Sequence, residues 1–330
     1  AEAGPAPAAA SCGARPRVLC CLWGELRGVR VTAESVRERL LVPLGADAAV
    51  VAQRQLPDDD ERLAVLREAW GSRLVLARLY DKPEPRAFFG GDCYEQMSRV
   101  RGNWLNRGNT QVLINHKVLG DLLSAEGLLQ QYDAFVFTRS DLLHVAPFPT
   151  SPELFAALGP TDVLTQAGHE FGGVNYNLAV LRGEIAGEYL AAPCRAVAAK
   201  AVAGGGSQTW NIERFIKSLI VERGWRNPRM SITCFITAES LGDRSTWRSV
   251  RSCARHPGVL YKYESQMVEA HRSAERWGRR PQWACLRPPR PLQVEENHGR
   301  AVRPFALALA EEVACAAVAR QDRERHQAAA

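Results

Sequence analysis

The chain has 330 residues, 46% of them hydrophobic, and a formal net charge of +6 at pH 7. This length suits one large α/β unit with extensions or two domains, and the hydrophobic fraction is ordinary for a globular protein with a sizeable core. The modest charge, with no dense basic run interleaved with aromatic residues, argues against a nucleic-acid-binding protein. No stretch approaches the roughly 18 consecutive apolar residues of a membrane span.

Residues 1–15 are rich in Ala, Pro and Gly and are expected to form a disordered leader or stem remnant. If an anchor precedes this leader, the expected location is the Golgi or secretory lumen, and otherwise it is the cytoplasm. The nine cysteines are irregularly spaced without a Cys-x-x-Cys pair, which gives a structural zinc site little support. A reducing compartment fits this set, with one or two disulfides in a secretory lumen as the alternative.

Strand and helix patterns alternate through the first third of the chain. Thr32 is expected to cap a helix that ends at Pro43, and the acidic run at residues 58–61 is expected to start a helix that reaches Trp70. Residues 80–109 form a polar, Gly-rich insertion of a kind that often carries function. The expected strands are at residues 17–22, 48–52, 74–79, 132–137, 162–166, 178–181 and 232–237. This alternation predicts a mostly parallel, three-layer α/β sheet.

A helical region is expected at residues 111–129, and another helix follows the strand at residues 178–181 and ends at Leu190. A third helix is expected at residues 208–223, capped by Ser207 and stopped by Gly224. From Asp243 onward the sequence is rich in Arg and Pro with little periodicity. A closing helix is expected at residues 305–320, because Pro304 suits a helix start.

Two polar clusters follow expected strands. The first is residues 23–28, where glycine allows close backbone approach and Arg27 suits a phosphate or a base edge. An ordinary strand-to-helix turn is the alternative. The second is residues 138–141, where Arg139 and Asp141 suit a phosphate and a divalent cation at the end of a buried strand. A structural ion pair is the alternative, and His144 is expected to be a buried histidine.

Two further clusters lie later in the chain. In residues 169–177, paired glycines would permit close contact with a sugar ring, Asn175 and Asn177 offer donors and acceptors for hydroxyls, and His169 and Glu170 add a candidate base. In residues 210–214, Trp210 could stack on a sugar or base, and Glu213 could be catalytic or simply support a capped amphipathic helix. The motifs of α/β-hydrolases, P-loop proteins and zincins are absent.

In order and spacing, these pieces resemble nucleotide-sugar-dependent glycosyltransferases of the GT-A type, in particular uncharacterised polysaccharide-type members. The resemblance spans residues 17–247 and implies a single Rossmann-like GT-A domain at residues 16–247. The Arg/Pro-rich extension with its closing helix would follow at residues 248–330. The implied activity is transfer of a sugar from a nucleotide diphosphate donor to a glycan or other hydroxyl acceptor.

The resemblance also implies residue roles. Asp141 matches the last acid of a DxD-type motif that holds Mn²⁺ or Mg²⁺, whereas Arg139 stands in place of the first acid. This departure leaves metal dependence open, and a catalytically degenerate binding or scaffold protein is the alternative. The nucleotide is expected at Trp23, Gly24, Arg27 and Arg139, and the acceptor or sugar at Gly172, Gly173, Asn175, Asn177 and Trp210. If the reaction inverts, the expected base is Glu170 first and Glu213 second.

Overall fold

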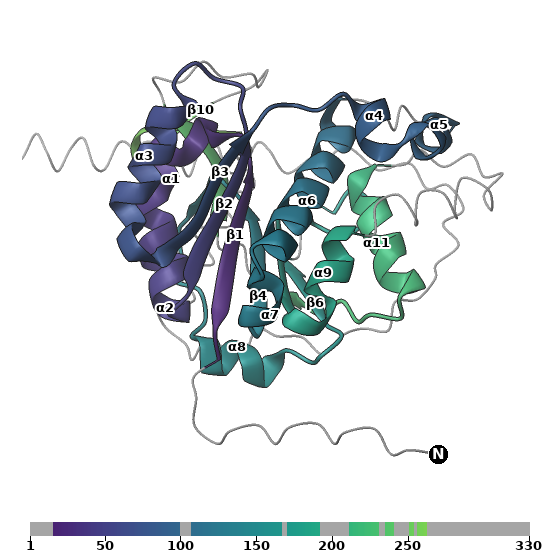
Figure 1. The fold of residues 1–330 in the computed structure, drawn as a ribbon. Coiled ribbons are helices and arrows are strands. Elements are labelled where there is room, and N and C mark those ends of the chain that lie inside the picture. The colour runs from purple at the N-terminus through teal and green to yellow at the C-terminus, as the bar shows by residue number, and fades with distance from the viewer. Residues whose placement is uncertain are drawn as a thin grey trace, which may run out of the picture. The chain divides into compact units, whose positions relative to one another are not determined.

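The computed structural model describes residues 16–99, 107–166, 170–191, 211–230, 235–240, 251–253 and 256–262 (Figure 1). The chain divides into two units, Ala1–Pro289 and Arg290–Ala330, and every described residue belongs to the first. The expected leader and the closing helix at residues 305–320 lie outside the described residues. None of the described helices is both long and apolar enough to span a bilayer.

A seven-stranded, mostly parallel sheet forms the centre of the described part. Its strand order is β3-β2-β1-β4-β7-β6-β8; β7 runs antiparallel to its neighbours β4 and β6, and the other neighbouring pairs are parallel. The strands are β1 (Val18–Gly24), β2 (Asp47–Gln53), β3 (Leu74–Tyr80), β4 (Ala134–Arg139), β6 (Val163–Gln166), β7 (Leu178–Arg182) and β8 (Arg229–Met230). The prediction of an α/β protein with a mostly parallel central sheet is confirmed, and the two-residue strand β8 was not predicted.

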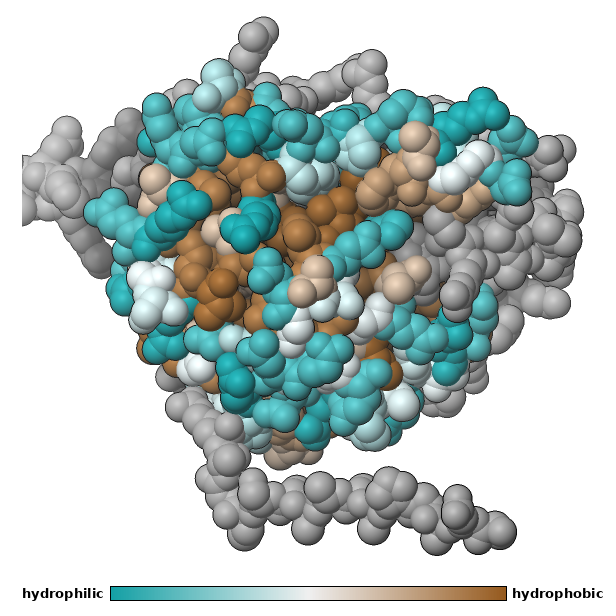
Figure 2. Space-filling view, viewed as in Figure 1, coloured by the Kyte–Doolittle hydropathy of each residue, from teal (hydrophilic) through white to brown (hydrophobic). Residues whose placement is uncertain are grey.

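Helices flank both faces of this sheet (Figure 1). On one side lie α1 (Val29–Val36) and α3 (Asp59–Trp70), and on the other α6 (Arg107–Ala125) and α9 (Gly183–Ala191). In the space-filling view, hydrophobic residues gather around the outer strand β3, where Val75 is 44% exposed (Figure 2). No strand in the described part of the chain pairs with the outer edge of β3.

A second, antiparallel sheet has the strand order β10-β11-β9-β5. Its strands are β5 (Leu142–His144), β9 (Phe235–Ser240), β10 (Arg251–Cys253) and β11 (His256–Tyr261). Only β9 overlaps an expected strand. Residues 251–262, placed in the extension by the sequence analysis, thus contribute two strands that join β9 and β5.

The first helical region differs from the prediction at both ends. Helix α1 begins at Val29 with Gly28 as its N-cap, so the expectation that Thr32 caps the helix was wrong. Pro43 does not end it either, because a π-helical turn (Arg37–Leu41) leads into α2 (Val42–Leu44). Proline has no N–H to donate to the carbonyl four residues earlier, and that carbonyl, of Arg39, accepts instead from the Phe148 amide at 2.6 Å.

Other helix boundaries also moved. Helix α11 (Ile212–Glu222) begins four residues later than expected, because Asn211 is its N-cap and accepts from the Arg214 amide at 2.9 Å. The expected cap Ser207 lies outside the described residues, whereas Gly224, at φ +64°, follows the end of α11 as predicted. The expected 111–129 helical region is confirmed as two helices, α6 and α7 (Leu128–Gln131), separated by Gly127 at φ +67°.

Three short helices were not predicted. The polar insertion contains α4 (Pro85–Phe89) and α5 (Gly91–Arg99). Helix α8 (Ser151–Ala157) starts with a capping box, in which the Thr150 hydroxyl and the Glu153 carboxylate satisfy backbone groups at the first turn.

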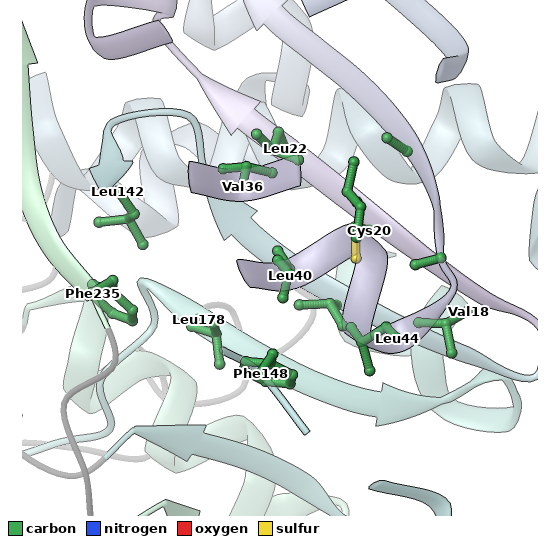
Figure 3. Packing of buried hydrophobic residues seen from close by; sticks show 14 of the residues in the cluster. Val18, Cys20, Leu22, Val36, Leu40, Leu44, Leu142, Phe148, Leu178 and Phe235 are labelled. Carbon is green, nitrogen blue, oxygen red and sulfur yellow. The ribbon is translucent and has the colours of Figure 1, made fainter. Parts of the chain in front are cut away.

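The main hydrophobic core lies between the central sheet and helices α1–α3. Alternate residues of β1, including Val18, Cys20 and Leu22, pack against Leu40, Leu44 and other side chains of that layer (Figure 3). Cys20 and Cys21 are fully buried free thiols, as the strand pattern indicated, and burial raises the pKa of both.

Candidate functional site

The ends of β1 and β4 lie side by side at the carboxyl edge of the central sheet. From β1 the chain continues to β2 and β3 on one side and later places β4 on the other, so the strand order changes direction between β1 and β4. Open α/β sheets bind ligands outside the carboxyl ends of strands at such a point. Trp23 and Arg139 are register partners on these two strands. The structure therefore brings the first two predicted clusters together.

Arg139 and Asp141 form a bidentate ion pair at the end of β4. Arg139 Nε donates to Asp141 Oδ1 at 2.8 Å, and Arg139 Nη2 donates to Oδ2. Arg139 Nη1 donates to Asn177 Oδ1 at 3.3 Å. The Asp141 side chain is 3% exposed and that of Arg139 is 23% exposed. The carboxylate is thus buried, while the arginine side chain reaches solvent in part.

Backbone contacts fix the segment that carries this ion pair. The Ser140 hydroxyl donates to the carbonyl of Glu25, and the Ser140 carbonyl accepts from the Thr32 hydroxyl at 2.8 Å. The Asp141 carbonyl accepts from the Ala238 amide on β9 at 2.8 Å. Thr32, expected as a helix cap, therefore tethers α1 to the end of β4. These contacts hold the ion pair in a defined place, which a binding site requires.

The loop after β1 turns at Gly24, whose φ of +105° favours glycine. The Arg27 guanidinium contacts the Glu25 carboxylate, and these side chains are 17% and 24% exposed. The loop is held from α3 by Arg62, whose Nη1 donates to the Arg27 carbonyl at 2.9 Å. Sequence reasoning missed Arg62. Its spacing of four from Asp58, with which it pairs at 3.0 Å, indicated a helical ion pair but not a contact with this loop.

Trp23, expected at the nucleotide, is buried at the end of β1, and a contact between its ring and a nucleotide stays a prediction. The residue is 3% exposed because its side chain points into the core. Its ring lies edge-on to His116, with centroids 5.1 Å apart, and stacks on Tyr176 at 6.1 Å. Trp23 therefore supports the β1 end from within the core.

Residues 170–177 connect this edge to the start of α11. At one end, the Asn177 side chain accepts a hydrogen bond from Arg139. The backbone amide of Asn177 donates to the side-chain oxygen of buried Asn175 at 3.1 Å. In the middle of the segment, the backbone amide of Val174 donates to the Glu213 carbonyl at 3.0 Å. The segment thereby joins the second, third and fourth predicted clusters. Trp210 and His169 lie outside the described residues.

Gly172 and Gly173 allow this segment to lie directly against α11. Gly172 has φ +84°, and a Cβ there would be 2.9 Å from Arg214 Nε. A Cβ on Gly173 would be 1.9 Å from the carbonyl carbon of Glu213. The start of α11 therefore fills the space beside Gly173. A contact between these glycines and an acceptor stays a prediction, while their packing against the helix explains why glycine is needed here.

The two candidate bases have different surroundings. The Glu170 carboxylate contacts Arg229 Nη1, an ion pair whose members are about one-third exposed. Burial raises the pKa of Glu213, which lies in the first turn of α11. A carboxyl with a raised pKa can take up a proton closer to neutral pH than an ordinary glutamate. The surroundings therefore favour Glu213 over Glu170, although the sequence had placed Glu170 first.

A hydrogen-bonded group near Glu25 was missed by the sequence analysis. The Tyr80 hydroxyl, at the end of β3, donates to Asn115 Oδ1, which also accepts from Gln111 Nε2 at 3.1 Å. Burial and, to a smaller extent, the charge of Glu25 raise the pKa of Tyr80. The signal in the sequence was the position of Tyr80 at the end of an expected strand, but its partners come from a helix more than 30 residues away.

The donor set at Asp141 does not fit a divalent cation as it stands. Such a cation needs carboxylate oxygens that are available as ligands, and both oxygens of Asp141 accept hydrogen bonds from Arg139. The described ranges also hold no group of three or more His, Cys, Asp or Glu residues placed to bind a metal.

The chain matches no known protein-family model and has no significant match among curated proteins.

Proposed function

We propose that this chain is a glycosyltransferase that moves a sugar from a nucleotide diphosphate donor to a glycan or other hydroxyl acceptor. The observation that carries the proposal is the Arg139–Asp141 pair at the carboxyl edge, where β1 and β4 adjoin and the strand order changes direction. Ligands of open α/β sheets bind at this position, and a guanidinium matches the geometry of phosphate oxygens.

The charges at this edge suit a reaction in which a diphosphate leaves. Negative charge develops on the leaving diphosphate as the bond to the sugar breaks, and a cation fixed beside it stabilises that charge. In this proposal Arg139 supplies the cation and Arg27 lies at the nucleotide. Asn177, held by the buried Asn175, keeps the Arg139 side chain in place from the opposite side to Asp141.

The acceptor is proposed to lie along residues 170–177, with Glu213 as the base. If the reaction inverts the sugar configuration, a carboxylate must remove the proton of the acceptor hydroxyl. Glu213 is joined to this segment through its carbonyl, and its pKa is raised by burial. Glu170 remains the second candidate, although its carboxylate is paired with Arg229.

A thermal-shift screen with UDP, GDP, CDP and ADP tests the proposal. We expect at least one nucleoside diphosphate to raise the Tm of the wild type, since a ligand that binds only the folded state stabilises it. The shift should be lost in R139A. Transfer is then measured as release of the nucleoside diphosphate from the matching sugar donor, with R139A expected to lose roughly tenfold or more of the rate.

The chain offers a matched control in the Arg226–Asp162 pair. It is also bidentate, at 2.6 and 2.7 Å, and its aspartate is likewise buried. Asp162 precedes β6, which runs in the same direction as β4, so this pair lies at the opposite edge of the sheet. R226A should lower the Tm but keep the ligand-induced shift. A shift lost equally in both variants would contradict the proposed site. Binding without any transfer would favour the scaffold alternative.

A further inference from the structure

Asp141, after β4, and Glu25, after β1, are both paired with arginines. Asp141 accepts two hydrogen bonds from Arg139, and the Glu25 carboxylate contacts Arg27. The Ser140 hydroxyl bridges the two loops through the Glu25 carbonyl, so these pairs belong to one connected structure. The carboxylates at this edge are therefore neutralised by side chains of the chain itself.

A divalent cation at Asp141 would have to break this arrangement. Asp141 would give up both hydrogen bonds from Arg139, and the guanidinium would be left close to a second positive charge. At a separation of a few ångströms, and with Asp141 buried, that repulsion is only weakly reduced by solvent. Arg139 is also held by Asn177, so it is tethered on more than one side.

We propose that Arg139 supplies the positive charge at this edge in place of a divalent cation, so that the chain binds a diphosphate without a metal. The diphosphate as ligand rests on the proposed function; the exclusion of metal from Asp141 does not. A guanidinium has five N–H donors in a rigid plane, so it can hold a carboxylate along one edge and meet phosphate oxygens along another. Asp141 is then a positioning residue, which orients Arg139.

The exclusion of metal is tested by adding Mn²⁺ without nucleotide. Binding is monitored by the electron paramagnetic resonance signal of free Mn²⁺. The wild type is expected to leave the signal of free Mn²⁺ unchanged. R139D removes the guanidinium and adds an acid two residues before Asp141, and it is expected to bind Mn²⁺ with an affinity roughly tenfold or more above that of the wild type. Mn²⁺ binding to the wild type that disappears in D141N would overturn the proposal.

The second arm measures the affinity for the nucleoside diphosphate chosen by the screen, by calorimetry, in EDTA and in Mn²⁺. The wild-type Kd should be the same in both within about twofold, because no metal contributes. R139A should bind roughly tenfold or more weakly in both conditions, since a hydrogen bond to a charged group is lost. R139D should bind weakly in EDTA and recover in Mn²⁺. Wild-type affinity that falls about tenfold in EDTA would overturn the proposal.

The two arms separate this inference from the proposed function. If no nucleoside diphosphate binds the wild type under either condition, the proposed function fails, and the Mn²⁺ experiment alone decides whether Asp141 excludes metal. Because R139D places two acids close together, its fold is checked by circular dichroism. If it does not fold, R139A replaces it, and equal loss of its affinity in EDTA and Mn²⁺ supports the proposal. Full recovery of R139A affinity in Mn²⁺ contradicts it.

Discussion

Gly28 packs directly against the backbone of Asp141. A Cβ on Gly28 would lie 2.9 Å from Asp141 Cα and 2.7 Å from the Ala238 carbonyl oxygen. Gly28 is also the N-cap residue of α1, so this contact joins the start of α1 to both sheets. The position of Asp141, and through it that of Arg139, depends on the absence of a side chain at residue 28.

G28A should therefore destabilise the protein and disturb the ion pair. Both neighbouring atoms belong to the backbone and cannot rotate away, so we expect a loss of about 1–3 kcal/mol in the free energy of unfolding, as for other overpacked sites. Urea denaturation measures this loss. The control is G91A, where the nearest atom of the described residues to a Cβ would be Arg86 Nε, at 4.0 Å. Equal stability of G28A and wild type would contradict the described packing.

N177A tests whether Asn177 positions Arg139. The Asn177 side chain accepts from Arg139 Nη1 at 3.3 Å, while Asp141 still holds the other side of the guanidinium. We therefore expect nucleoside diphosphate binding to weaken by roughly threefold to tenfold, less than in R139A. The control T150A removes the capping box of α8 and should cost about 1 kcal/mol of stability without changing the affinity. Unchanged affinity in N177A would leave Asn177 without a positioning role.

The sequence predicted the central sheet well because its strands are short apolar runs. Such a run predicts a buried strand without any knowledge of the elements that pack against it. The six predicted strands of this sheet before residue 182 all form. The boundaries around Pro43 could not be predicted in the same way. There the helix continues because the Arg39 carbonyl finds the Phe148 amide, a partner more than 100 residues away. Similarly, β5 is three residues long and exists through its pairing with β9.

For the site, the sequence located the clusters and offered an ion pair between Arg139 and Asp141 as the alternative to a ligand site, and the structure contains this ion pair. Strand ends identified Arg139 and Asp141, whereas the bidentate contact between them depends on side-chain geometry that spacing alone does not specify. The burial of Trp23 was not predicted, for a related reason. The side chains of a strand alternate between its two faces, and the sequence did not tell which face of β1 carries a helix over its last residues.

E213Q should slow transfer strongly while leaving donor binding intact, if Glu213 is the base. General-base catalysis contributes about 10²–10⁴-fold, so a loss of this size in kcat is expected with little change in the Kd of the nucleoside diphosphate. The pKa of Glu213 is raised by burial, so kcat/KM should rise with pH through a value above that of an ordinary glutamate. The comparison is E170Q, expected to lose much less. The reverse ranking of the two variants would assign the base to Glu170.

Two buried histidines should make the fold sensitive to acid. Burial lowers the pKa of His116 and His144 to about 4, from an ordinary value of 6.5. Neither nitrogen of His144 has a hydrogen-bond partner among the described residues, and its ring lies edge-on to Phe235 at 5.9 Å. The unfolded chain binds these protons near pH 6.5 and the folded chain only near pH 4. Stability is therefore full above pH 6.5 and falls as the pH drops toward 4.

Each histidine should account for about 3 kcal/mol of this loss, since one pKa unit corresponds to about 1.4 kcal/mol. Urea denaturation at pH 7.5, 6 and 5 follows the loss, and each histidine should have lowered the free energy of unfolding by about 2 kcal/mol at pH 5. H144L removes one of the two groups together with its two unpaired nitrogens, so it should be about as stable as the wild type at pH 7.5 and lose about half as much by pH 5. Wild-type stability that is constant over this range would show that folding does not lower the pKa of these histidines.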